Sequence, residues 1–153
     1  MHVGIDPGKS GSVCFLDVDT ETFKIIPTPI IKLDKREYDI PEMRAIVEKM
    51  VEDCKICVIE KSQAMPGQGV SSMFSIGKGY GIWLGLLVAH GIPFIEVHPK
   101  TWTKKMFFGQ GGEGKERNYM KARQLFPNWQ PKHKYEREYA DSLLLASYGA
   151  RYL

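Results

Sequence analysis

Four acidic residues stand at positions where a hydrolytic metal site could form. Asp6 ends the apolar stretch HVGID, and Glu60 ends the apolar run KICVIE. Glu138 and Asp141 are three residues apart, so a helix would project both from one face. An acid beside a buried surface is unfavourable unless a cation pairs with it. The pattern favours a pocket of carboxylates neutralised by divalent ions.

A site of this kind is suited to phosphodiester hydrolysis. Two oxygen-ligated Mg²⁺ ions about 4 Å apart can activate a water and stabilise the leaving oxygen of an in-line displacement. Two other interpretations stay open at this point. The turn PGKS after Asp6 could cradle a phosphate, and each acid taken singly could be a turn former, a strand-end charge or part of a first helical turn.

The elements that must position these acids are those of an α/β fold. Strands are expected at residues 2–6, 11–18, 22–31, 55–60 and 92–97, and helices at 40–54, 72–91, 99–108, 115–126 and 136–153. Because three strands precede any helix, the sheet should be mixed, with an antiparallel opening. If the strands 2–6 and 55–60 are neighbours in its centre, Asp6 and Glu60 lie side by side.

The bulk composition is that of an ordinary globular protein with one core. The chain has 153 residues, of which 43% are hydrophobic and 25% charged, so one domain over residues 1–153 is expected. Three cysteines make a disulfide framework improbable. No apolar run approaches the ~18 residues that span a bilayer, and no signal peptide is recognisable. We therefore expect a cytoplasmic protein without membrane association.

Positive charge is concentrated in one part of the chain. Between His98 and Arg137 there are ten Lys or Arg residues against three acids, whereas the remainder carries a net negative charge. Aromatic residues are interleaved with these cations. The segment suits a polyanion that offers both phosphates and stackable bases, although a solvated basic surface would look the same.

Several blocks of the chain resemble the RuvC-type Holliday junction resolvases, particularly the phage members and the plant chloroplast resolvases of that superfamily. The blocks are GIDPGKSG, VIEKSQAMPGQG, GYGIWLGLL, VHPKTWTKKMF and EYADSLLLASYG, in order from His2 to Tyr148. The resemblance implies an RNase H-like fold with a mixed five-stranded sheet and helices on both faces. It also implies a homodimer that nicks two opposed strands of a four-way DNA junction with Mg²⁺ or Mn²⁺.

The resemblance assigns roles to the four acids. Asp6, Glu60, Glu138 and Asp141 are implied to be both catalytic residues and ligands of two metal ions. Bacterial RuvC has aspartate where this chain has Glu138, and the extra methylene group moves that carboxylate outward. Direct ligation by Glu138 is therefore less secure than ligation by the other three.

The resemblance also implies which residues touch DNA. The loop after Glu60 would lie at the junction centre, where Met65, Gln68, Met73 or Phe74 could wedge among bases. The full set of candidates is Lys9, Ser10, Lys61, Gln68, Met73, Phe74, Lys78, Lys100, Lys104, Lys105, Lys115, Arg117, Lys121, Lys132 and Lys134. The dimer surface is expected on the glycine-rich helix from Ser75 to His90.

Other functions compete with junction resolution. An actin-like ATPase or sugar kinase also opens with an acid and a small-residue turn, but it needs a second lobe for which 153 residues leave no room. A nuclease of the same fold could act on other branched DNA or on RNA:DNA hybrids. A non-catalytic junction-binding protein is disfavoured, because four negative charges would weaken phosphate binding.

Overall fold

The computed structural model describes residues 1–32, 34–63, 66–108 and 114–153, and in them a mixed sheet forms the centre of the fold. Its strands run in the order β3-β2-β1-β6-β7. They are β1 (His2–Ile5), β2 (Ser12–Asp17), β3 (Thr22–Pro27), β6 (Ile56–Glu60) and β7 (Phe94–Val97). The pairs β1–β2 and β2–β3 are antiparallel, and β1–β6 and β6–β7 are parallel. The predicted five-stranded mixed sheet is confirmed.

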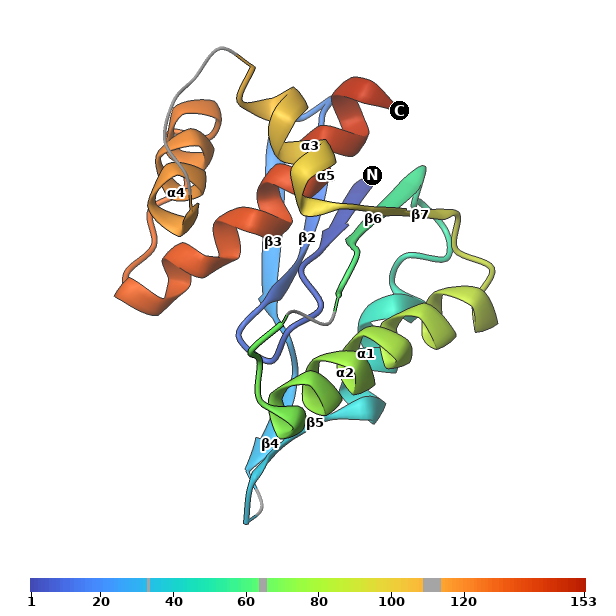
Figure 1. The fold of residues 1–153 in the computed structure, drawn as a ribbon. Coiled ribbons are helices and arrows are strands. Elements are labelled where there is room, and N and C mark those ends of the chain that lie inside the picture. Colours follow the sequence, from blue (N-terminus) through green and yellow to red (C-terminus); the bar gives the residue numbers. More distant parts are fainter. Residues whose placement is uncertain (33, 64–65, 109–113) are drawn as a thin grey trace.

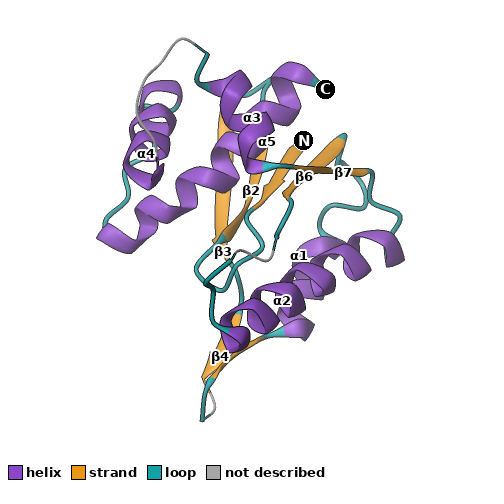
Figure 2. Cartoon of the chain, viewed as in Figure 1, coloured by secondary structure: helices purple, strands orange, loops and turns teal. Residues whose placement is uncertain are grey.

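Helices cover both faces of this sheet (Figure 1). One face carries α1 (Ile40–Glu48) and α2 (Val70–Ala89), and the other carries α3 (Pro99–Met106), α4 (Gly114–Leu125) and α5 (Ala140–Tyr152). Alternate strand residues serve the two faces, since Cys57 packs in the α1/α2 core and Val58 in the α5 core. The layers are also distinct in Figure 2, which is coloured by secondary structure.

The helix α5 lies deepest in the fold. Residues 140–149 are all buried, as its apolar sequence predicted. It approaches β1 closely at Gly4, where an added Cβ would lie 2.1 Å from the Ser142 carbonyl oxygen. Ser12 on β2 and Ser142 on α5 share a buried hydrogen bond of 2.7 Å between their hydroxyls. These contacts hold the first turn of α5 against the carboxyl end of β1.

The prediction of one long third strand over residues 22–31 is wrong. The strand β3 ends at Pro27, and the next residues form a separate two-stranded sheet of β4 (Ile30–Lys32) and β5 (Arg36–Tyr38). Pro27 and Pro29 have no N–H to donate to a continuing ladder. The backbone N–H of Thr28 instead donates to the carbonyl of Gly11. We refer to residues 30–38 as the β4–β5 ribbon; Leu33 within it is outside the described residues.

Two helix boundaries also differ from expectation. The helix predicted over 136–153 is divided into a 3₁₀ helix, η1 (Lys134–Tyr139), and α5, which begins at Ala140. The helix predicted over 40–54 ends at Glu48, and the rest of that segment forms turns. The apolar periodicity continues beyond Glu48 because Met50 is still buried in a turn.

The helix α2 is long and apolar. By length and composition alone it could cross a bilayer, with 20 residues and a mean hydropathy of 1.2. All of its residues are described, and those that are buried are Gly79, Trp83 and Leu87. These three lie four residues apart on one face of the helix, with Trp83 and Leu87 in the core and Gly79 against the Tyr38 side chain. Ile82, Leu84 and Leu86 are only partly buried against that core, and the large apolar side chains that the helix exposes are Val70, Phe74 and Val88.

Candidate active site

Asp6 and Glu60 emerge side by side from the centre of the sheet. In the parallel pairing of β1 and β6, Ile5 lies opposite Ile59, so the residues that follow each of them share one sheet edge. The expected adjacency of these two acids is thus confirmed. Asp141, the second residue of α5, reaches the same edge because α5 packs along β1.

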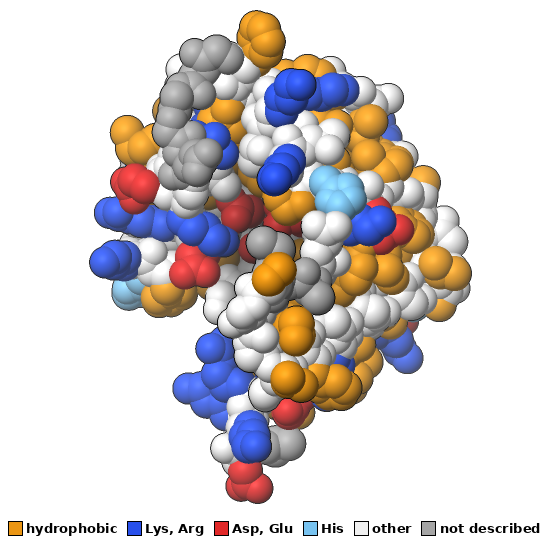
Figure 3. Space-filling model, viewed as in Figure 1, with side chains coloured by type: hydrophobic (Ala, Val, Ile, Leu, Met, Phe, Trp, Pro, Cys, Tyr) orange, Lys and Arg blue, Asp and Glu red, His pale blue; other side chains and the backbone are white. Residues whose placement is uncertain are grey.

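The helix α4 closes this pocket from one side. The ammonium of Lys115 lies 2.9 Å from Oδ2 of Asp141 and 4.0 Å from Oδ2 of Asp6. The Asn118 amide donates to Oδ1 of Asp141 at 2.6 Å. The side chains of Asp6 and Asp141 are 17% and 8% exposed, respectively, so both acids are largely withdrawn from solvent. In Figure 3, acidic side chains are recessed near the middle of the face shown, between Lys and Arg side chains.

The helix α3 fixes the third acid. The indole N–H of Trp102 donates to Oε2 of Glu60 at 2.7 Å. Trp102 is fully buried, with its ring tilted against Phe107, so its N–H has a defined direction. This hydrogen bond holds one Glu60 oxygen and leaves the other available to face Asp6.

Burial and mutual repulsion make it unfavourable for the acids of the pocket to be ionised together. Burial raises the pKa of Asp6 to about 6, with Lys115 lowering it and the nearby Asp141 and Glu138 raising it. Burial raises the pKa of Glu60 to about 7; the Trp102 hydrogen bond lowers it, and the charges of Asp6 and Asp141 raise it. Burial opposes the charge of Lys115, yet the carboxylates raise its pKa overall. The single ammonium of Lys115 cannot neutralise the three carboxylates of Asp6, Glu60 and Asp141 when all are ionised.

Glu138 lies at the rim of the pocket, not in its centre. It belongs to η1, and with Lys9, Ser10 and Arg36 it lines an open depression of about 500 Å³. Among the charges that raise the pKa of Asp6, that of Glu138 ranks below that of Asp141. The expectation that Glu138 and Asp141 share one α-helical face is therefore wrong in detail, because the α-helix starts between them.

The acids of this pocket are the type of ligand that a divalent cation prefers, but their present arrangement does not form a binding site for one. Carboxylate oxygens are the ligands that Mg²⁺ prefers, and mutual repulsion among buried acids is what such an ion relieves. However, within the described ranges no group of three or more His, Cys, Asp or Glu side chains is arranged to hold a metal ion. The Lys115 ammonium lies between Asp6 and Asp141. A cation would have to take its place there.

Comparisons with known proteins identify the fold. No family model matches the chain, and no curated protein matches it. Among solved structures, Thermus thermophilus RuvC superposes with a TM-score of 0.63 at 19% identity, covering 97% of this chain and 94% of RuvC. The chain has the RuvC fold. RuvC is RNase H-like, so the predicted fold class is confirmed.

Two further structures share the RuvC fold. T. thermophilus RuvC in complex with a Holliday junction substrate gives a TM-score of 0.64 at 17% identity, covering 97% of this chain and 93% of that one. The yeast mitochondrial Holliday junction resolvase Ydc2 gives 0.62 at 14% identity, covering 97% of this chain and 77% of that one. The likeness therefore extends over nearly the whole chain.

Within the RuvC fold, the candidate DNA-binding residues fall into two groups. The exposed ones are Ser10, Lys61, Phe74, Lys78, Lys100, Lys104, Lys105, Lys132 and Lys134, and the partly buried ones are Lys9, Gln68, Met73, Arg117 and Lys121. Lys115, although exposed along its stem, directs its ammonium to the acids, and the Arg117 guanidinium lies 4.0 Å from the Phe107 ring centroid. Met65 is outside the described residues. The DNA-binding assignments stay predictions.

Sequence reasoning missed two residues of the site, Trp102 and Asn118. Trp102 is one of the aromatic residues interleaved with the cations of segment 98–137, a pattern that suggests contact with bases and not with an acid. Asn118 follows Lys115 by three residues, so on a helix the two share a face. This spacing could have identified Asn118 as a second residue facing the acid, but only if Lys115 was already known to contact that acid.

For the endonuclease activity proposed below, replacing Trp102 with phenylalanine is expected to lower the rate of DNA cleavage roughly tenfold and to move its pH profile toward higher pH. The ring volume is largely kept, but Glu60 loses the hydrogen bond that lowers its pKa. Rates should be measured from pH 5.5 to 9. Trp129→Phe is the matched control, since Trp129 is buried against Tyr119 and its backbone carbonyl accepts from Arg123. An unshifted profile for Trp102→Phe would show that the indole does not tune Glu60.

Proposed function

We propose that this protein is a metal-dependent endonuclease that resolves four-way DNA junctions. The observation that carries the proposal is the convergence of Asp6, Glu60 and Asp141 at one sheet edge of a chain with the RuvC fold. A structure with that fold has been solved on a Holliday junction substrate, and another is a Holliday junction resolvase. Four-way or other branched DNA is the proposed substrate.

The proposed metal site uses Asp6, Glu60 and Asp141, with Glu138 at its margin. Two Mg²⁺ ions, or Mn²⁺, would supply an activated water and stabilisation of the leaving oxygen. The chain's own part is to hold the acids in place. Trp102 orients Glu60, and Asn118 orients Asp141. Lys115, displaced from between Asp6 and Asp141, would offer its ammonium to a substrate phosphate.

The test is cleavage of a synthetic four-way junction labelled on each strand in turn. Purified protein with Mg²⁺ should give nicks in two opposed strands, and chelator should abolish them. Linear duplex, a flap and an RNA:DNA hybrid serve as comparison substrates. Equal cleavage of the hybrid would assign the protein to another nuclease class of this fold. Binding of the junction without cleavage in Mg²⁺ or Mn²⁺ would make it a non-catalytic binder.

We infer that the protein acts as a homodimer joined through the exposed face of α2. A Cβ added at Gly77, Gly81 or Gly85 would meet nothing within 4 Å, so these glycines form a smooth, open stripe. Val70 and Val88, near the two ends of the helix, are exposed apolar residues. Two such stripes can pack backbone against backbone and remove apolar surface from water. Paired nicking of opposed strands requires two sites, which a dimer supplies.

Gly81→Arg is expected to convert the dimer to a monomer. The long charged side chain would stand in the middle of the stripe and keep two α2 helices apart. Sedimentation velocity measures the outcome, with Val51→Arg as a control at an exposed apolar site on another element. A wild-type monomer would contradict the dimer. If that monomer binds lipid vesicles and Gly81→Arg does not, the face belongs to a membrane surface instead.

A further inference from the structure

A basic depression lies on the α2 side of the carboxylate pocket, apart from the basic segment 98–137. It has a volume of about 760 Å³ and is bordered by the β4–β5 ribbon, the turn after β1 and the beginning of α2. Of the described residues that line it, four are cationic, Lys9, Lys35, Arg36 and Lys78, and one is acidic, Glu37. Lys35 and Arg36 lie on the ribbon that the sequence did not predict.

The ribbon is anchored to α2 by one aromatic side chain. Tyr38 is buried, and its hydroxyl donates to the Ser75 carbonyl at 3.2 Å. Its ring lies directly over Gly79, where an added Cβ would come within 2.2 Å of the Tyr38 hydroxyl oxygen. The ribbon is therefore held in a defined position on the helix.

The turn after β1 clasps the ribbon from the other side. The Lys9 ammonium donates to the Arg36 carbonyl, and the Arg36 guanidinium donates to the Lys9 carbonyl at 3.3 Å. The Lys9 ammonium also lies 5.3 Å from the centroid of the Tyr38 ring. The backbone between Lys9 and Asp6 is short, so this clasp couples the ribbon to the catalytic turn.

The basic surface is continuous with the active site. Lys9 and Arg36 line both this depression and the one of about 500 Å³ that contains Glu138. The track thus runs from Glu138, past the Lys9–Arg36 clasp, to the exposed Phe74 near the start of α2. Figure 3 shows Lys and Arg side chains gathered over the ribbon at the lower end of the molecule.

We infer that this β4–β5 patch, made of Lys9, Lys35, Arg36 and Lys78, binds the sugar-phosphate backbone of a DNA arm. The inference rests on the proposed function. The depression is open and its cations lie along a track, which suits phosphates repeated along a strand. Glu37 is occupied by Lys78 at 2.9 Å, which leaves the other three cations unmatched by an acid within the patch.

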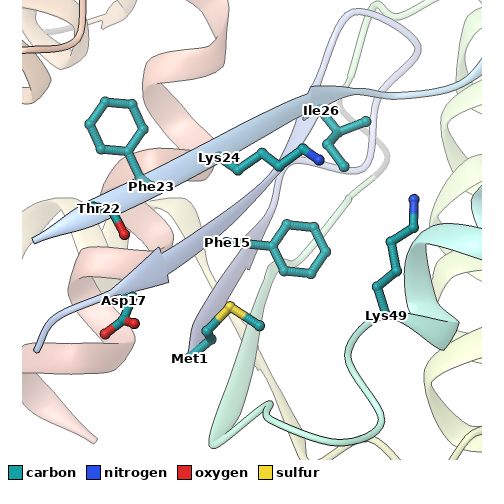
Figure 4. Close-up of a pocket in the computed structure, with 8 residues that line it drawn as sticks. All are labelled: Met1, Phe15, Asp17, Thr22, Phe23, Lys24, Ile26 and Lys49. Atoms are coloured by element: carbon teal, nitrogen blue, oxygen red, sulfur yellow. The ribbon is translucent and has the colours of Figure 1, made fainter. Parts of the chain in front are cut away.

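The test measures the affinity of the protein for a labelled four-way junction in the presence of chelator. Fluorescence anisotropy is the readout, and the measurement is repeated over a range of salt concentrations. The variant Lys35→Gln/Arg36→Gln should bind about tenfold more weakly at low salt, and the slope of log K against log salt should fall by about 2. The matched control is Lys24→Gln/Lys49→Gln. Those lysines border a depression beside Met1, at the opposite end of β1 from Asp6 (Figure 4).

The outcomes separate this inference from the proposed function, because binding in chelator needs no chemistry. If wild type cuts junctions and the ribbon variant binds like the control, the patch is not a DNA contact and the function stands. If wild type binds without cutting and only the ribbon variant is weakened, the patch stands and the nuclease proposal falls. Absence of junction binding by wild type overturns both. Thermal unfolding checks that both variants fold, and Lys35→Gln alone, which leaves both Lys9 and Arg36 of the clasp in place, should still lower the slope by about 1.

Discussion

Asp6→Asn is expected to lower the rate of junction cleavage by roughly 10³-fold or more while junction affinity is unchanged or tighter. Asparagine keeps the size of the side chain and removes the charge that would hold the cations. Asp6 is the acid at the centre of the pocket. It lies 4.0 Å from the Lys115 ammonium, the charge of Asp141 raises its pKa, and it follows the strand paired with the one that ends in Glu60. Removing a negative charge from the path of a phosphate cannot weaken binding electrostatically. Single-turnover cleavage and anisotropy measure the two effects separately.

The same variant should make the metal-free protein more stable. The pKa of Asp6 is raised to about 6, so its ionised form at pH 8 opposes folding by an amount on the order of 3 kcal/mol. The neutral amide removes that term. Asp19→Asn, in the exposed turn between β2 and β3, is the matched control. Wild-type cleavage by Asp6→Asn would refute the metal site, whatever the stability result.

Divalent cations should stabilise the protein strongly at pH 8 and hardly at all at pH 5. The pKa values of Asp6 and Glu60, about 6 and about 7, lie above the value of about 4 expected in the unfolded chain. Between pH about 4 and pH about 7, the folded protein therefore binds more protons than the unfolded chain. Without a cation, the stability contributed by these two groups is present below pH about 4 and is lost as pH rises through about 6 to 7.

A bound cation reverses that loss, because it requires the ionised carboxylates and does not bind their protonated forms. Scanning calorimetry with Mg²⁺ or Ca²⁺ should show a rise in Tm of several degrees at pH 8 and almost none at pH 5. Cleavage with Mg²⁺ should increase over the same pH range. A rise in Tm that is independent of pH would mean that the ion binds elsewhere.

The competition with Lys115 provides a second check on the same site. Lys115→Gln removes the ammonium that lies between Asp6 and Asp141, so the cation should bind more tightly and raise Tm further. Lys121→Gln changes the same charge on the same helix, but Lys121 bonds to Gln124 and not to the acids. Identical cation responses in the two variants would show that Lys115 and the ion do not share a place.

The sequence predicted the parts of the fold that depend on local periodicity. Apolar runs and helical spacing identified the strands and helices, and the acids at the ends of β1 and β6 followed from the expected parallel pairing. The β4–β5 ribbon was not predictable in this way. Its strands have three residues each, and its position depends on Tyr38 entering the space over Gly79 on a helix 41 residues further along the chain.

The site was predictable only in its acids. The partners that hold them come from distant helices, with Trp102 separated from Glu60 by 42 residues and Lys115 from Asp141 by 26. Charge alone does not say whether a lysine faces a phosphate or a carboxylate, so Lys115 was grouped with the DNA-binding residues. The position of Glu138 depended on where η1 gives way to α5, and helix boundaries follow tertiary packing as much as sequence.

The absence of a side chain at Gly4 sets how closely the last helix approaches the central strand, and with it the separation of Asp141 from Asp6. Any larger residue there would act as a wedge between the central strand and the last helix, because its first carbon would already overlap the Ser142 carbonyl. The helix would retreat with Asp141 on it, while Asp6 stayed on the strand. The spacing of the proposed metal ligands thus depends on a residue that has no functional group of its own.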